Sequence, residues 1–158
     1  MAVAVKSTKK ILLLILLFLQ IACGTKETRE FGEFEPYITQ FELEAAKHHW
    51  PLKIISLTVK FGTLPSQTLA MCTVNHQESL ITVNETRWSG LSNTQKTIVL
   101  YHELGHCVLN RRHDNSEDPK KEKKIKSIMH AHPLIASDYE LHEDAYLAEL
   151  FFENSDNQ

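Results

Sequence analysis

The residues best suited to chemistry are three histidines and a glutamate in "HELGHCVLNRRH" (residues 102–113). His102 and His106 are four residues apart, so on a helix their imidazoles lie one above the other and can reach one metal ion. Glu103 follows the first histidine directly, where a carboxylate can take a proton from a water molecule beside that metal. The pattern His-Glu-x-x-His therefore predicts a metal-dependent hydrolytic site.

Zinc is the metal that this pattern favours. Zn²⁺ with three protein ligands keeps a position for water and lowers the pKa of that water towards neutrality. Glu103 would then act as general base and pass the proton to a leaving amine, which is the chemistry of peptide-bond hydrolysis. His102 and His106 would supply two of the three ligands.

A helix is expected to carry this motif. "SNTQ" (residues 92–95) has the spacing of a capping box, and the next fifteen residues contain no proline, so a helix of about five turns should begin near Asn93. The other faces of this segment are apolar. Without a metal, the helix would have to bury the imidazoles and the carboxylate unpaired or expose them.

The segments around this helix predict an α+β domain. Residues 54–62, 68–76 and 79–88 are rich in β-branched side chains and read as three strands, the last two forming a hairpin. We expect a short mixed sheet in which residues 79–84 offer their edge to an extended substrate. Apolar spacing predicts further helices over residues 37–50 and 134–152. The charged stretch 114–126 reads as an exposed loop.

With these elements in this order, the chain resembles the metzincin group of zinc metalloproteases. "HELGH" matches the first part of that group's motif, and "SIMH" (residues 127–130) looks like its methionine turn. The resemblance covers roughly residues 54–152. It implies a small zincin-like fold of sheet, active-site helix, methionine turn and C-terminal helix, with Met129 as an apolar floor beneath the metal.

The third zinc ligand departs from the spacing of that group. The family motif would place glycine at Leu109 and the ligand at Arg112, whereas Asn110 and His113 each come one residue later. Asparagine tolerates the left-handed conformation that ends a helix abruptly. One extra helical residue before the same turn makes His113 the predicted third ligand, with Asp114 as the nearest alternative, either as ligand or as partner of a histidine.

Two other arrangements remain open. In the gluzincin arrangement the third ligand is a glutamate on a later helix, for which Glu143 is the best candidate, followed by Glu140 and Glu149. A non-catalytic zinc-binding lipoprotein would instead close the site with a fourth ligand, supplied by Asp114, His130 or Glu143.

The N-terminus has the pattern of an export signal. Three lysines precede the apolar run of residues 11–21, which is too short to span a bilayer comfortably. "LQIACGT" resembles a bacterial lipoprotein signal, which implies a lipid anchor at Cys23; an ordinary signal or an uncleaved anchor is the alternative. We expect a signal peptide (1–22), a lipidated tether (23–35) and a zinc metallopeptidase domain (36–158). Gly24 after the cysteine implies an outer-membrane lipoprotein of the bacterial cell envelope, facing the periplasm or the exterior.

Charge and cysteine content restrict the partners. The 17 basic residues less the three lysines of the signal leave 14, against 20 acidic residues, so nucleic acid is excluded as an expected partner. Cys72 and Cys107 could pair in an exported protein or remain free; their spacing does not decide. The sequence thus predicts a zinc-dependent endopeptidase of the cell envelope that acts on a peptide or protein substrate. It indicates no oligomeric state.

Overall fold

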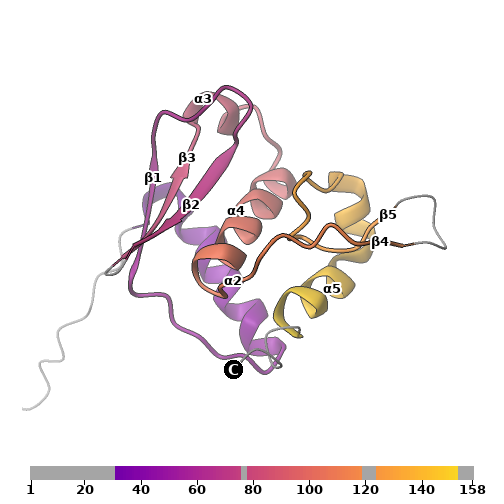
Figure 1. Ribbon diagram of the computed structural model, residues 1–158. Helices are drawn as coiled ribbons and strands as arrows, with labels where there is room; N and C mark the ends of the chain where they lie inside the picture. Colours follow the sequence, from indigo (N-terminus) through magenta and orange to yellow (C-terminus); the bar gives the residue numbers. More distant parts are fainter. Residues whose placement is uncertain (1–30, 76–77, 119–123, 153–158) are drawn as a thin grey trace, which may run out of the picture.

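The computed structural model describes residues 31–75, 78–118 and 124–152 (Figure 1). The expected signal peptide, Cys23 and the first part of the tether lie outside these described residues. The elements in chain order are the 3₁₀ turn η1 (Gly32–Phe34), α2 (Glu35–Lys47), β1 (Leu57–Phe61), β2 (Ala70–Val74), β3 (Ser79–Val83), α3 (Glu85–Trp88), α4 (Asn93–Cys107), β4 (Glu117–Asp118), β5 (Lys124–Ile125) and α5 (Ala136–Phe152). The predicted α+β class is confirmed.

The main sheet is mixed and has the order β1-β3-β2. β1 is parallel to β3, and β2 pairs with β3 as the predicted antiparallel hairpin. β3 is therefore the central strand, and the prediction that residues 79–84 form a free edge is wrong. The apolar side chains of Ile81 and Val83 are fully buried, which suits a strand that has neighbours on both sides. β2 is the edge strand nearest to α4.

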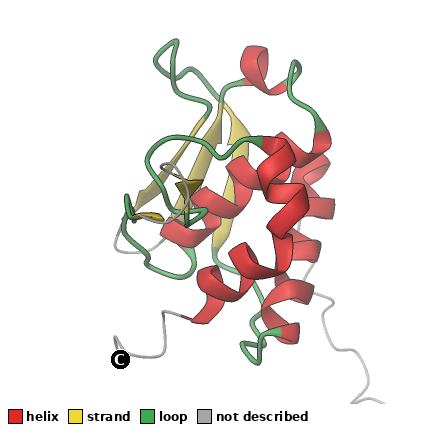
Figure 2. Cartoon of the chain, turned by 90° about the vertical axis from the view of Figure 1, so that its right-hand side faces the viewer, coloured by secondary structure: helices red, strands yellow, loops and turns green. Residues whose placement is uncertain are grey.

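The helices lie on one face of this sheet (Figures 1 and 2). α4 packs against β2 and β3, and it also contacts α2 and α5. The core between these layers is apolar and includes Ile38, Phe41, Ala45, Leu57, Ile81, Leu100, Leu104 and Leu150. Phe31 and Phe34 are also buried in this core, although they fall in the segment that the sequence suggested as a tether.

The predicted start of α4 is confirmed by its cap. The Ser92 side chain accepts a hydrogen bond from the Gln95 backbone N–H, and the Gln95 side chain accepts one from the Ser92 N–H. The helix ends at Cys107, after 15 residues and about four turns, one turn earlier than expected. The third strand also ends early, because the Asn84 side chain caps the short helix α3 where the sequence suggested further strand.

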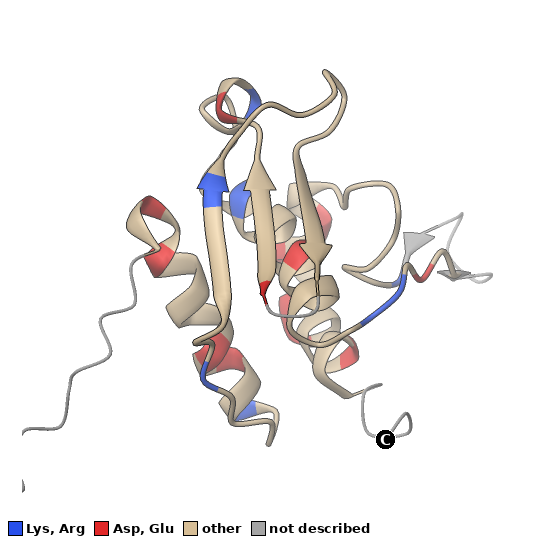
Figure 3. Cartoon of the chain, turned by 60° about the vertical axis from the view of Figure 1, so that its left-hand side comes forward, with Lys and Arg blue, Asp and Glu red and all other residues tan. Residues whose placement is uncertain are grey.

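The described chain carries mixed charge. Lys and Arg positions are scattered along it among Asp and Glu positions (Figure 3). None of the helices within residues 31–152 that the structure describes is long and apolar enough to cross a membrane.

Candidate metal centre and active site

Three histidines converge beside α4. The Nε2 atoms of His102 and His106 are 3.1 Å apart, and the Nε2 atoms of His102 and His113 are 3.2 Å apart. One nitrogen from each ring lies within 4.8 Å of the others, which makes this trio a possible metal site. The structure therefore brings together the three predicted ligands, two from one helix face and one from the loop that follows.

A left-handed turn returns the chain towards the helix and places His113. Asn110 has a φ of 54°, as predicted for a residue that ends the helix in place of glycine. The Arg111 backbone N–H donates to the Gly105 carbonyl oxygen at 2.9 Å, which closes the turn. This turn brings His113 beside the two helix histidines, as predicted, and Arg112 is not part of the cluster.

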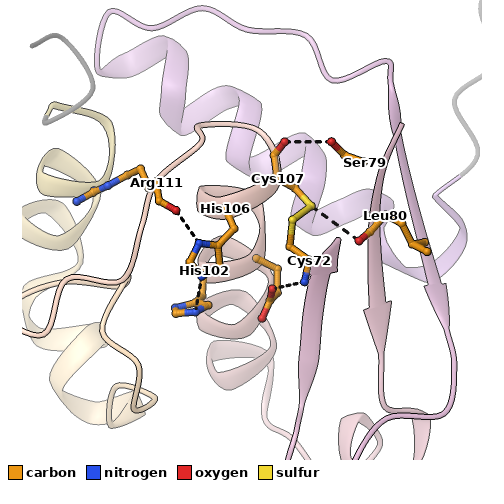
Figure 4. The surroundings of a disulfide bond; sticks show 8 residues. Cys72, Ser79, Leu80, His102, His106, Cys107 and Arg111 are labelled. Carbon is orange, nitrogen blue, oxygen red and sulfur yellow. Dashed lines mark hydrogen bonds between the residues drawn. A yellow bond between two sulfur atoms is a disulfide. The ribbon is translucent and has the colours of Figure 1, made fainter. Parts of the chain in front are cut away.

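Backbone carbonyl groups fix the orientation of the two helix histidines. His102 Nδ1 donates to the Ile128 carbonyl oxygen at 2.8 Å. His106 Nδ1 donates to the Arg111 carbonyl oxygen at 2.6 Å (Figure 4). In a neutral imidazole the proton then sits on Nδ1, so each Nε2 presents a lone pair. Hydrogen bonds of this kind commonly orient metal-binding histidines.

The electrostatics of the trio fit a cation. Burial lowers the pKa of His102 to about 4 and also lowers the pKa of His106. Both rings are therefore neutral near pH 7, as a metal ligand must be. Two lone pairs that face each other at 3.1 Å repel unless a cation lies between them. A tetrahedral zinc ion with Zn–N distances of about 2.0–2.1 Å holds its nitrogens roughly 3.3 Å apart, so the donor set and its spacing fit zinc.

Glu103 lies beside the histidines as a buried carboxylate with one anchored oxygen. Its Oε2 accepts a hydrogen bond from the Cys72 backbone N–H at 2.7 Å, and its residue exposure is 8%. Burial raises the pKa of Glu103 to about 7, and the hydrogen bond from Cys72 acts in the opposite direction. A group with this pKa can both accept and release a proton near neutral pH.

A pocket of about 450 Å³ opens over these groups. The three histidines and Glu103 line it, together with residues 67–72 on and before the edge strand β2 and with His130 from the turn of residues 127–130. Sequence reasoning offered His130 as a possible fourth ligand of a closed zinc site. In the structure His130 is buried against the pocket, whereas His132 is exposed.

Cys72 and Cys107 form a disulfide with a Cα–Cα distance of 5.7 Å (Figure 4). This decides between the paired and free states that the sequence left open. The bond joins the middle of β2 to the last residue of α4, and Cys72 is also the residue whose N–H holds Glu103. The edge strand and the helix of the candidate site are therefore covalently connected.

Met129 packs directly under α4. Its side chain is fully buried, and a Cβ atom on Gly105 would overlap its Sδ atom. Gly105 thus allows the turn of residues 127–130 to approach the helix between His102 and His106. Sequence reasoning did not single out Gly105, although a glycine inside a helical pattern is a signal of close approach.

A buried ion pair with α5 supports the turn of residues 127–130. No sequence pattern predicted it. The Arg111 guanidinium binds the Glu149 carboxylate and also donates to the carbonyl oxygens of Glu149 and Leu150. The Ser127 hydroxyl donates to Glu149, and the Met129 N–H donates to the Ser127 oxygen. The C-terminal helix is thereby linked to both loops whose carbonyls orient His102 and His106.

The alternative ligands lie elsewhere. Among the described residues, the histidine trio is joined by none of the candidates Asp114, His130, Glu140, Glu143 and Glu149. All five accept hydrogen bonds from other groups: Glu140 from Thr94, Glu143 from Tyr139, Asp114 from the Ser116 N–H, Glu149 from Arg111 and Ser127, and His130 Nδ1 from the His132 N–H. The glutamate-ligand and closed four-ligand arrangements are therefore not formed in this structure.

Comparison with known proteins agrees with this geometry. Residues 56–132 match the model of a family described as "Putative phage metallopeptidase". No curated protein and no solved structure shows significant similarity to the chain. The matched segment contains the whole sheet, α4, His113 and the methionine turn. The chain therefore contains a metallopeptidase-like domain, with a small zincin-like α+β fold and a histidine trio able to hold a metal ion.

Proposed function

We propose that this chain is a zinc-dependent endopeptidase in which His102, His106 and His113 bind the metal and Glu103 transfers the proton. The observation that carries the proposal is the position of Glu103: a buried carboxylate, with a pKa near 7, lines the same pocket as three converging imidazoles. A purely structural metal site has no use for such a group. The family match supports the same class of reaction.

The chemistry divides between the metal and the protein. When bound, zinc supplies Lewis acidity, which polarises a carbonyl group and makes water easy to deprotonate near pH 7. Glu103 accepts the proton from that water and delivers it to the leaving amine. The Cys72 N–H holds Oε2. Oε1 has no hydrogen-bond partner among the residues that the structure describes, so this oxygen is the one available for proton transfer.

The edge strand β2 is the proposed docking site for substrate. β2 pairs with β3 on one side, and its residues 70–72 line the pocket on the other. An extended peptide can add to such an edge through backbone hydrogen bonds. A substrate on this edge lies next to Glu103, and β2 takes the docking role that was predicted for residues 79–84.

We further propose that the protein is an exported lipoprotein of the bacterial cell envelope, anchored at Cys23. The proposal rests on the N-terminal sequence pattern. The disulfide between Cys72 and Cys107 supports it, because disulfides persist mainly in oxidising compartments outside the cytosol.

The decisive test of the reaction compares the wild-type protein with Glu103→Gln and with Glu85→Gln, a control at an exposed glutamate. Zinc content and cleavage of casein and of a mixed peptide library are measured for each. Glu103→Gln should retain one zinc per chain and lose at least about 10³-fold in kcat, because only the proton transfer is removed. Full activity of Glu103→Gln would refute the mechanism. Stoichiometric zinc without any cleavage by the wild type would favour the non-catalytic zinc-binding lipoprotein.

The ligand set is tested separately by His113→Ala, with His132→Ala as the exposed control. Loss of one of three ligands should lower zinc affinity by at least about 100-fold, while the control should bind zinc as the wild type does. Zinc retained by His113→Ala would point to another third ligand.

A further inference from the structure

We propose that His130 is a catalytic residue that donates a hydrogen bond from Nε2 to the carbonyl oxygen of the substrate as negative charge develops there. This inference rests on the proposed peptidase function and adds a second acting side chain to it.

His130 reaches the pocket from a different element than Glu103 does. It closes the methionine turn, where its backbone N–H donates to the Ser127 carbonyl oxygen at 3.2 Å. Its side chain is buried, with a residue exposure of 7%, and it lines the pocket together with His102 and Glu103. The ring is also close enough to His102 for a charge on His130 to lower the pKa of His102.

The local backbone fixes which nitrogen of His130 carries the proton. The His132 backbone N–H donates to His130 Nδ1 at 3.0 Å. A backbone N–H can only donate, so Nδ1 is the acceptor, and a neutral ring must carry its proton on Nε2. The His132 carbonyl oxygen, 3.2 Å from the same Nδ1, receives no proton in this tautomer.

Nε2 of His130 has no partner of its own. Within residues 31–75, 78–118 and 124–152, no group accepts a hydrogen bond from it. Nor does Nε2 belong to the described polar atoms that are fully buried and unbonded, so solvent reaches it. His130 lines the pocket, and the proposal directs this N–H donor to a substrate bound there.

Amide hydrolysis needs a donor of this kind. As water adds to the carbonyl carbon, negative charge grows on the carbonyl oxygen, and a donor already fixed in place stabilises it without reorganisation. The position of His130 does not suit metal binding, because its ring nitrogens lie outside the cluster formed by the other three histidines. A hydrogen bond to this developing charge lowers the energy of the transition state more than that of the bound substrate, so its loss should lower kcat more than it changes KM.

Two substitutions separate the two nitrogens of His130. His130→Asn keeps an acceptor near the Nδ1 position for the His132 N–H but lacks a donor at the Nε2 position. His130→Gln places an amide N–H₂ near the Nε2 position instead. The proposal predicts that Asn lowers kcat by about 100-fold with KM nearly unchanged, and that Gln recovers at least about tenfold of this loss. If His130 only stabilised the turn by accepting from the His132 N–H, the Asn variant would instead be more active than the Gln variant.

The test uses the full zinc-loaded protein and has readouts besides activity. Zinc content and thermal stability are measured for both variants, and binding of a phosphinic peptide, whose tetrahedral anion needs the same donor, is measured by calorimetry. We expect wild-type zinc content and phosphinic-peptide binding about tenfold weaker in Asn than in Gln. Zinc loss in both variants would mark His130 as a ligand, and wild-type kcat and binding in Asn would likewise overturn the proposal.

Failure of the proposed function is recognised separately. It would appear as a wild-type protein that cleaves no peptide, or as a Glu103→Gln variant that remains active. In the first case the phosphinic-peptide measurement still decides whether His130 donates into the pocket, because it needs no turnover.

Discussion

Two flanks of α4 hold the site in different ways. The sheet flank consists of Cys72, Glu103 and Cys107, and it combines a disulfide with one hydrogen bond from the backbone of β2. The turn flank consists of Arg111, Ser127, Met129 and Glu149, and it combines a buried ion pair, hydroxyl and backbone hydrogen bonds, and close packing. The sheet flank contains Glu103, the proposed proton-transfer residue. The turn flank supports the carbonyls that orient two of the metal-binding candidates.

The difference follows from what each group must do. A carboxylate that transfers protons needs one free oxygen, so a single bond from Cys72 to Oε2 is sufficient. Two imidazoles that share one ion need both of their planes fixed, and the carbonyls that fix them belong to Ile128 and Arg111 on separate loops. Only a tertiary network can hold two loops at once. We therefore expect damage to the turn flank to weaken metal binding, and damage to the sheet flank to lower kcat while zinc is retained; either can also lower stability.

The largest effect is expected for Arg111→Met. This change leaves the Glu149 carboxylate partly buried without its cation, and breaking one side of such a pair costs about 3–5 kcal/mol of unfolding free energy. The loop carbonyl that holds His106 loses its support, so zinc affinity should fall as well. Urea unfolding and zinc titration measure the two effects.

Arg112→Met is the matched control, because Arg112 is the exposed neighbour. It should change stability by no more than about 0.5 kcal/mol. If both arginine variants unfold alike, the ion pair contributes nothing and the turn flank is held by packing alone.

The next largest effect is expected for the double variant Cys72→Ala/Cys107→Ala. The two cysteines are 35 residues apart, and loop entropy predicts a loss of about 2–4 kcal/mol when their bond is removed. Zinc should be retained, because the carbonyls that orient the histidines lie on the other flank. The value of kcat should fall, because Cys72 no longer keeps β2 at a fixed distance from α4.

Reduction of the wild type provides the control for this variant. Dithiothreitol should lower the unfolding free energy of the wild type towards that of the double variant and leave the double variant unchanged. Zinc loss upon removal of the disulfide would contradict the division of labour between the flanks.

The parts of this arrangement that the sequence could predict are local. The capping box at Ser92, the i to i+4 spacing of His102 and His106, and the left-handed Asn110 all depend on residues within a few positions of one another. Backbone geometry converts such spacing directly into structure. His113 was predicted from the resemblance to the metzincin motif, together with the local tolerance of Asn110 for a left-handed turn, and the structure places it beside the other two histidines.

The parts that the sequence could not predict are tertiary. Nothing in "RRH" distinguishes its two arginines, yet Arg111 is buried and pairs with Glu149 on α5, 38 residues later, whereas Arg112 is exposed. Similarly, the hydrophobic pattern indicated three strands but could not order them, since the central and edge positions depend on which partner β1 finds. The disulfide depends on that order too, because only an edge β2 brings Cys72 to the end of α4.

The third effect in size is a pH-dependent difference in stability between Glu103→Gln, in the sheet flank, and the wild type. Burial raises the pKa of Glu103 from 4.5 to about 7, so between these values the folded chain keeps a proton that the unfolded chain has lost. The corresponding stability is present at low pH and is lost as the pH rises through 7. In Glu103→Gln this titration is absent. Relative to the metal-free wild type, the unfolding free energy of metal-free Glu103→Gln should therefore rise by on the order of 1–3 kcal/mol between pH 4.5 and pH 8.

Chemical unfolding of the metal-free proteins across this pH range measures the difference, with Glu85→Gln as the exposed control. His102 titrates in every variant, and its contribution largely cancels in the comparison. If the difference in unfolding free energy between Glu103→Gln and the wild type stayed constant over this pH range, burial would not raise the pKa of Glu103.

The smallest effect is expected for Gly105→Ala and concerns the turn flank again. The new methyl group would overlap Met129 Sδ, and Met129 is fully buried, so the turn of residues 127–130 must shift. Overpacking of this kind costs about 1–3 kcal/mol, offset by about 0.5–1 kcal/mol from better helix propensity. Gly90→Ala is the matched control, since its nearest neighbour would be an ordinary 3.8 Å away. Calorimetric unfolding and zinc titration give the two readouts.

The double variant Gly105→Ala/Met129→Val then identifies the cause. A shorter side chain at residue 129 makes room for the methyl group. If the overlap in Gly105→Ala displaces Ile128, whose carbonyl orients His102, the double variant should bind zinc more tightly than Gly105→Ala does. If Gly105→Ala loses stability but binds zinc normally, the turn supports the fold without setting the orientation of His102. In that case only the Arg111 half of the turn flank positions the metal-binding histidines.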